Sequence, residues 1–304
     1  MEANLKRDQR EQNVVKDAAP EFNPMELMIC LAARYLEDGS SVVVGTGAPC
    51  AAAMLAQKTH APNLMILFEA GGIGPLLPTM PISVGDSRTF HKGIMASTMT
   101  EIMNACQRGV VDYCFLGGAQ IDQYGNINST VIGSFAKPKV RLPGSGGAND
   151  LASLCWKTMV ITPHDPRRFV EKVDFITSPG YLWGKGAREE VGLPPETGPH
   201  KIITNLCVMG FDEETKRLRV ETIHPGVSKA DVVAATGFEL MLRYPDCPVP
   251  RSSESCEKKW IRKSTSSDGK QLKKEPASRT HAGSSCGYGI PRTQGQGRYV
   301  WYRA

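Results

Sequence analysis

Short apolar runs alternate with segments of helical periodicity along the first 240 residues. Asn23 and Pro24 form a typical helix start, apolar residues follow at the spacing of an amphipathic helix, and Gly39 supplies its stop. Residues 42–44 are three successive valines, which is typical of a strand buried on both faces. A later helix is predicted from the cap pair Ser228 and Asp231 to a stop at Gly237.

The same alternation continues between these two ends. The other predicted helices lie at residues 50–58 and 97–108, the other predicted strands at residues 64–69, 111–116, 159–162 and 173–177, and a hairpin at residues 201–208 and 218–223 around a polar turn. Strands and helices in this order are typical of parallel βαβ units. We therefore expect an α/β fold, with an open, mostly parallel sheet, flanking helices and a domain at residues 23–244.

The two ends of the chain differ from this domain. Residues 1–22 are polar and predict an N-terminal arm. Residues 245–304 are rich in Ser, Lys, Arg, Gly and Gln, lack apolar periodicity, and predict a disordered tail. This tail holds 12 basic against 5 acidic residues, whereas the rest holds 24 against 26. The basic charge belongs to the tail, so charge gives no support for nucleic-acid binding by the domain.

Composition narrows the remaining classes. No apolar run approaches the ~18 residues of a membrane helix, and no secretory signal precedes the domain. The nine cysteines are scattered without a Cys-x-x-Cys pair, which predicts a reducing cytoplasmic location and no metal site. The expected protein is a cytoplasmic enzyme or binding subunit that contacts neither membranes nor nucleic acids.

Glu69 ends the predicted strand of residues 64–69 and is followed by Ala70, Gly71 and Gly72. In open parallel sheets, ligands bind beyond the carboxyl ends of the strands. The turn at residues 45–47 and the glycine pair at residues 117–118 are expected at the same edge. A carboxylate placed there is typical of a general base or a covalent nucleophile. The alternative is that Glu69 caps the next segment or pairs with a surface arginine.

Residues 143–150, PGSGGAND, form a glycine-dense loop. Such a loop can direct successive backbone N–H groups at an oxyanion, although glycine-rich loops are more often flexible turns. The loop is neither a Walker motif nor a dinucleotide fingerprint. Gln120 follows another predicted strand and is a candidate for substrate contact, while residues 124–126 equally predict a hairpin turn.

Several ordered stretches resemble the β subunits of family I coenzyme A transferases, in particular the glutaconate CoA-transferase group. They are VVVGTGAP, LMILFEAGG, SVGD, LGGAQIDQYGNINST, GSGGAND, RRFVEKVDFITSPGY and HPGVSKADVVAATGFEL. The resemblance implies a fold shared with certain sugar-phosphate isomerases and a separately encoded, homologous α subunit. It ends near Leu242, where relatives continue with an acidic helical segment, and an altered reading frame would give a tail of this composition.

The resemblance also implies the chemistry. Glu69 matches the family's catalytic glutamate, and Ala70 replaces the Ser or Asn of many relatives. The substrates are an acyl-CoA and a carboxylic acid, exchanged by a ping-pong mechanism with coenzyme A as substrate and no permanently bound cofactor. The small residues after Glu69 are expected to leave room for the thioester. The residues expected to bind CoA, the substrate or the thioester oxygen are Gly144, Gly146, Gly147, Ala148, Gln120, Gly45 and Gly47.

Two alternatives to the transferase stay open. One is a CoA-thioester hydrolase or ring-opening enzyme on the same fold, in which Glu69 activates water. The other is a non-catalytic subunit whose partner carries the chemistry. His91 and the pair Arg167–Arg168 are interpreted as surface residues.

Overall fold

The computed structural model describes residues 22–242, which belong to one compact unit. The predicted N-terminal arm and basic tail lie outside this range. The helices are α2 (Pro24–Arg34), α3 (Ala48–Thr59), the 3-10 helix η1 (Ser87–Phe90), α4 (Met99–Gln107), α5 (Ala148–Leu154), α6 (Ala187–Glu190) and α7 (Lys229–Ala234). The strands are β1 (Ser41–Val43), β2 (Met65–Leu67), β3 (Gly72–Ile73), β4 (Met95–Ala96), β5 (Tyr113–Leu116), β6 (Gln120–Ile121), β7 (Ile127–Asn128), β8 (Val131–Gly133), β9 (Pro138–Arg141), β10 (Lys157–Ile161), β11 (Gly198–Ile203), β12 (Cys207–Phe211), β13 (Leu218–Ile223) and β14 (Met241–Leu242).

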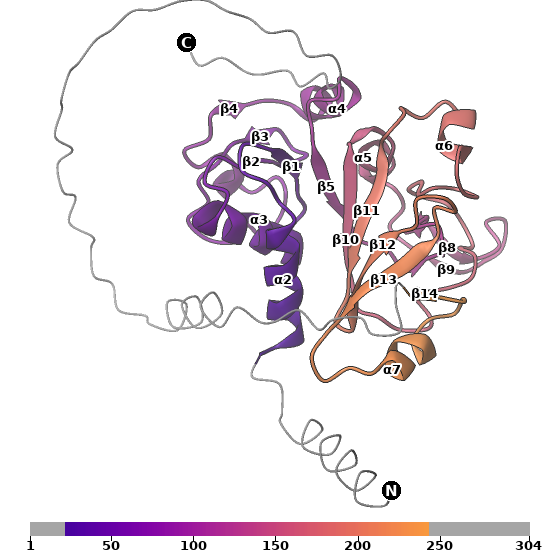
Figure 1. Ribbon diagram of the computed structural model, residues 1–304. Coiled ribbons are helices and arrows are strands. Elements are labelled where there is room, and N and C mark those ends of the chain that lie inside the picture. The colour runs from indigo at the N-terminus through magenta and orange to yellow at the C-terminus, as the bar shows by residue number, and fades with distance from the viewer. Residues whose placement is uncertain (1–21, 243–304) are drawn as a thin grey trace, which may run out of the picture. The chain divides into compact units, whose positions relative to one another are not determined.

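Ten strands form one large sheet in the order β14-β13-β12-β11-β10-β5-β1-β2-β3-β4. The five central strands, from β11 to β2, are parallel to one another. Strands β12 and β13 extend one side in antiparallel fashion, and β3 and β4 extend the other. The helices flank this sheet (Figure 1). The predicted α/β class with an open, mostly parallel sheet is therefore confirmed.

The three valines at the start of the sheet explain its two hydrophobic cores. Val42 and Val44 belong to the core that contains residues of α2 and α3, whereas Val43 belongs to the core that contains residues of α4, α5 and α7. Successive side chains of a strand point to opposite faces, so a continuous apolar run serves both cores. Each fully buried side chain of this size contributes roughly 1.5–3 kcal/mol through removal from water.

Helix starts follow the predicted caps. The Asn23 side chain accepts a hydrogen bond from the Met25 N–H, and α2 begins at Pro24. A capping box between Ser228 and Asp231 begins α7. Gly39 does not end α2 directly, because the helix stops at Arg34 and Gly39 takes a left-handed conformation in the turn that follows.

Two predicted strands are wrong. Residues 201–208 are not continuous, because a turn at residues 204–206 separates β11 from β12, and the Thr204 hydroxyl accepts hydrogen bonds from the N–H groups of Leu206 and Cys207. Residues 173–177 form no strand, since this segment is held by side chains and by bonds to Ile127 in the β6–β7 hairpin. The polar turn between β12 and β13 and the hairpin turn at residues 124–126 lie where the sequence predicts them.

Among residues 22–242, no helix combines the length and apolar character that a membrane crossing requires.

Candidate active site at the carboxyl edge of the sheet

Three predicted segments meet at one edge of the sheet. The register pairs Val43 of β1 with Leu67 of β2 on one side and with Cys114 of β5 on the other. Because these strands are parallel, the segments after their carboxyl ends emerge side by side. The turn at residues 45–47, the Glu69 segment and the glycine pair at residues 117–118 thus lie at the same edge, as expected.

Glu69 occupies a tight turn that reverses the chain from β2 into β3. The Gly71 N–H donates to the Phe68 carbonyl at 2.9 Å, and the Phe68 N–H donates to the Gly72 carbonyl at 2.8 Å. These bonds place Glu69 and Ala70 at the two central positions of a β-turn. Since the flanking residues are fixed by main-chain bonds, the position of the Glu69 backbone is well defined.

Gly71 and Gly72 have a different role from the one expected. A β-carbon at position 71 would collide with the carbonyl of Ser97, and one at position 72 would collide with the carbonyl of Thr89. Gly71 also has a φ of 114°, which side chains rarely tolerate. The two glycines therefore make room for neighbouring backbone of this chain, rather than for an incoming thioester.

The Glu69 side chain is partly exposed. Within residues 22–242 it accepts no hydrogen bond and forms no ion pair, so neither the capping role nor the pairing with a surface arginine is seen there. Its carboxylate lies against Gly147. A β-carbon at position 147 would be 2.7 Å from Glu69 Oε1 and 2.6 Å from the terminal methyl group of Met103.

The glycine-dense loop thus reaches the carboxylate, and its N–H groups fall into two classes. The Gly144 N–H donates to the Ser129 carbonyl at 2.8 Å, and the Ala148 N–H donates to the Ser145 carbonyl at 3.0 Å. The N–H groups of Gly146 and Gly147 find no acceptor among the described residues. They precede α5, whose N-terminus carries a partial positive charge. Two of the four predicted loop residues are therefore available to a ligand.

The site has a second anchor that the sequence does not predict. Thr98 and Glu101 form a capping box that begins α4, and the Ser97 hydroxyl also donates to the Glu101 carboxylate. The Ser97 N–H donates to the Gly71 carbonyl at 2.9 Å, which joins this cap to the Glu69 turn. The spacing of Thr98 and Glu101 is a recognisable signal for a capping box, but their contact with the Glu69 turn leaves no local pattern.

Gln120 lies in a buried polar network. Its amide nitrogen donates to Asp174 at 3.0 Å, and its amide oxygen accepts from the Asn128 side chain at 2.7 Å and from the Asp174 N–H at 3.0 Å. With 7% of its surface exposed, Gln120 has its hydrogen-bonding capacity largely used within the chain. Its predicted contact with the substrate stays a prediction.

Gly45 and Gly47 lie at the predicted edge. Gly47 is the N-cap of α3 with a φ of 81°, and its carbonyl accepts the Ala51 N–H at 3.0 Å. Gly45 has open space around it. The N-terminus of a twelve-residue helix therefore lies at this edge, where it favours negative charge.

Acidic, histidine and cysteine side chains are the usual protein ligands of metal ions. No group of three such side chains among the described residues comes together in a way that could hold a metal ion.

Comparisons with known proteins agree with this geometry. A family model described as Coenzyme A transferase matches residues 25–235. The chain is 40% identical over 220 residues to the β subunit of 3-oxoadipate CoA-transferase from Pseudomonas knackmussii, and 39% identical over 227 residues to the β subunit of glutaconate CoA-transferase from Acidaminococcus fermentans. Each match covers 72% of this chain and 84% of the relative.

A solved structure is similar as well. The crystal structure of glutaconate coenzyme A-transferase from Acidaminococcus fermentans superposes with a TM-score of 0.71 at 34% identity. The superposition covers 79% of this chain and 94% of that one.

Proposed function

Because the chain belongs to the coenzyme A transferase family, whose members move CoA between an acyl-CoA and a free acid, we propose that Glu69 is the nucleophile of this reaction. The observation that carries the proposal is the contact between the Glu69 carboxylate and Gly147. This contact brings an unpaired carboxylate and two unused N–H groups to the same edge of the sheet.

The proposed reaction proceeds in two half-reactions. The Glu69 carboxylate attacks the thioester carbonyl of acyl-CoA and expels the CoA thiolate, which leaves an acyl-glutamyl anhydride. The thiolate then attacks the glutamyl carbonyl, which releases the acid and leaves a CoA thioester on Glu69. The acceptor carboxylate attacks that thioester, and the expelled thiolate takes up the new acyl group and regenerates Glu69.

A carboxylate suits this sequence of steps because its anhydride remains activated toward a thiolate. The N–H groups of Gly146 and Gly147 are placed to stabilise the negative oxygen that forms in each attack. One such donor is typically worth about 3–4 kcal/mol of transition-state stabilisation. Gly147 has no side chain, so its backbone can approach the reacting carboxylate closely.

The chain is proposed to act with a companion α subunit of the same fold and to be inactive alone. The similar transferases are named as single subunits of larger enzymes, which supports this proposal. Their names also include 3-oxoadipate and glutaconate, so the proposed substrates are thioesters of small acids that bear a second carboxylate. Cys50, Cys106, Cys114 and Cys155 are free thiols, which supports the expected cytoplasmic location.

The test is to incubate the assembled two-subunit enzyme with acyl-CoA in the absence of an acceptor acid. One CoA adduct per chain is expected, and borohydride reduction followed by peptide mass analysis should locate it at Glu69. An adduct on another residue would contradict the assignment. Net thioester loss without exchange to an added acid would favour the hydrolase, and full activity of Glu69→Ala would favour a non-catalytic subunit.

A further inference from the structure

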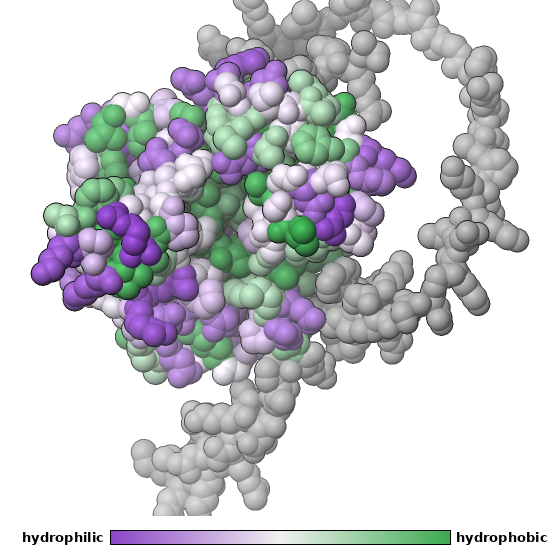
Figure 2. Space-filling model, turned by 180° about the vertical axis from the view of Figure 1, so that it is seen from behind, coloured by the Kyte–Doolittle hydropathy of each residue, from purple (hydrophilic) through white to green (hydrophobic). Residues whose placement is uncertain are grey.

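Six large apolar side chains are exposed within one run of the chain, residues 76–99, which we call the apolar platform. They are Leu76, Met80, Ile82, Ile94, Met95 and Met99, and the most exposed are Ile82 at 84% and Ile94 at 74%. Single apolar residues on the surface are normal in soluble proteins, and Figure 2 shows such positions scattered among hydrophilic ones. The concentration of six in so short a run is what distinguishes the platform.

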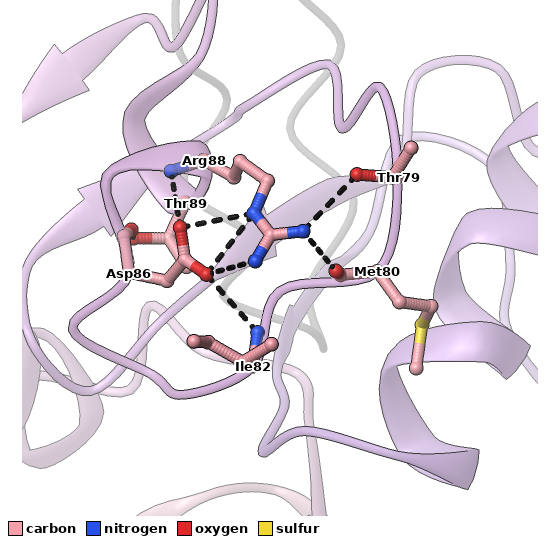
Figure 3. Close-up of polar contacts among 6 residues, drawn as sticks. All are labelled: Thr79, Met80, Ile82, Asp86, Arg88 and Thr89. Carbon is pink, nitrogen blue, oxygen red and sulfur yellow. Dashed lines mark hydrogen bonds and ion pairs between the residues drawn. The ribbon is translucent and has the colours of Figure 1, made fainter.

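The platform is held in shape by a clasp between Asp86 and Arg88 (Figure 3). The Asp86 carboxylate accepts hydrogen bonds from the Arg88 side chain, from the Arg88 N–H at 2.9 Å and from the Ile82 N–H at 3.1 Å. Arg88 Nη1 donates onward to the Met80 carbonyl at 2.8 Å and to the Thr79 hydroxyl at 3.2 Å. The side chains of Met80 and Ile82 therefore project from an ordered backbone.

Charge is scarce on the platform. Besides the paired Asp86 and Arg88, the run contains Lys92 as its only other Lys, Arg, Asp or Glu. Few charges together with Met, Ile and Leu resemble the buried centre of a protein–protein interface. A peripheral membrane surface would instead call for several basic residues.

The outer strand of the sheet belongs to the platform. Strand β4 is the last strand on its side, and both of its residues, Met95 and Ala96, are exposed. Exposed apolar edge strands invite pairing with another chain, and native proteins usually cover or charge them. This strand carries no charge, so a partner is the remaining way to cover it.

The platform is also joined to the proposed nucleophile. The Gly71 carbonyl accepts the Ser97 N–H, and Gly72 lies against the Thr89 carbonyl. Both glycines follow directly after the turn that carries Glu69. A protein that covers the platform would therefore place its own surface beside Glu69.

We propose that the apolar platform is the docking surface of the companion α subunit, an inference that rests on the proposed two-subunit function. A pre-ordered surface loses little conformational entropy on binding, and an apolar one gains from burial. A docked subunit would cover β4 and close the side of the active site that its own chain leaves open.

The experiment measures association of the full-length chain with the α subunit from the same organism, without substrate. Ile82→Asp and Ile94→Asp are each expected to raise the dissociation constant at least tenfold, because each buries an unpaired charge in the interface. Val233→Asp is the matched control, since Val233 is 51% exposed on α7 and is expected to bind within twofold of wild type. Melting temperatures of the single chains establish that all three variants fold.

Wild-type affinity in both platform variants would overturn the proposal, as would an equal loss in Val233→Asp. So would a wild-type chain that binds only itself, or phosphatidylglycerol vesicles, through the same residues. The catalytic proposal is judged separately. A Glu69→Ala complex that assembles normally yet still exchanges acyl groups would contradict the nucleophile and leave the docking surface standing.

Discussion

Gly147 lies so close to the Glu69 carboxylate that a single added methyl group would be 2.7 Å from Oε1. The two residues come from distant parts of the sequence, one from the β2–β3 turn and the other from the residue that precedes α5. The contact sets the position of the carboxylate relative to the N–H groups of the glycine-dense loop. Any change at position 147 should therefore be felt at Glu69 first.

Gly147→Ala is expected to lower the exchange rate of the assembled enzyme by about 10²-fold, because misplacement by about 1 Å can have this effect. Gly147 has a φ of −81°, so alanine fits the backbone and the effect is steric rather than conformational. Steady-state kinetics of acyl exchange measures the loss.

The added methyl group would also meet Met103, and a double variant separates the two contacts. Met103→Ala together with Gly147→Ala removes the clash with Met103 and leaves the clash with Glu69. The exchange rate should stay low in the double variant. Recovery to the rate of Met103→Ala alone would mean that the position of α4, and not the carboxylate, limits the reaction.

Glu69→Gln should reduce exchange by about 10³-fold or more, because the amide has a similar shape but is not a nucleophile. The melting temperature should change little, since Glu69 has no hydrogen bond or ion pair within residues 22–242. Calorimetry and kinetics on the same preparation measure both. A large loss of stability would show a structural role for Glu69. Slow deamidation restores the carboxylate, so activity should be recorded on fresh protein.

Stability is expected to fall as the pH is lowered from about 6.5 toward 4. His164 is buried between the hydroxyls of Thr204 and Thr236 and stacks on Phe169. Burial lowers the pKa of His164 to about 4, against about 6.5 in the unfolded chain. The unfolded chain therefore binds more protons in this interval, and the stabilisation present above pH 6.5 is lost as the pH falls.

For His164 this loss is on the order of 3 kcal/mol. Urea midpoints at pH 7.5, 6 and 5 measure it, and His164→Gln should flatten part of the slope. Burial also lowers the pKa of His200 to about 4, so some slope should remain in that variant. Equal midpoints at all three values of pH in the wild-type chain would contradict the prediction.

Arg88→Ala should weaken assembly with the α subunit about tenfold, because the run around Met80 and Ile82 would then have to become ordered on binding. Arg167→Ala is the control, since the Arg167 side chain is 94% exposed and pairs with Asp165 in its own turn. Titration calorimetry of each variant against the α subunit compares them. Equal affinities for the two variants would separate the clasp from assembly.

Deletion of residues 250–304 should leave the domain folded, because this stretch has no amphipathic pattern that could be buried. These residues lie outside the described part of the chain, so the expectation rests on sequence alone. Thermal unfolding of the shortened chain measures the effect. A fall of more than about 5 °C, on the order of 2 kcal/mol, would indicate that the tail packs against the domain.

The central parallel strands could be predicted because their apolar runs are continuous, as at residues 42–44 and 111–116. Caps such as Asn23 and the Ser228–Asp231 pair are local chemistry and could be predicted too. The antiparallel extensions β3 and β4 have two residues each, too few to show a period. They form through pairing with neighbouring backbone, which no local pattern records.

The site divides in the same way. The place of Glu69 at the sheet edge followed from strand order, which is a topological rule. Its contact with Gly147, the use of the Gly144 and Ala148 N–H groups inside the loop, and the engagement of Gln120 by Asp174 are all long-range or conformational. The Asp86–Arg88 clasp is local, but its spacing has no established meaning in a loop.

The turn at residues 69–72 has a consequence for how this protein can diversify. Gly71 and Gly72 tolerate no side chain because main chain lies against them, and replacing Glu69 would remove the proposed chemistry. Ala70 is free of both constraints, as the second central residue of the turn and partly open to solvent. Evolutionary drift beside the reactive carboxylate is thus channelled into one codon, where a new polar group can retune acid preference and leave the scaffold unchanged.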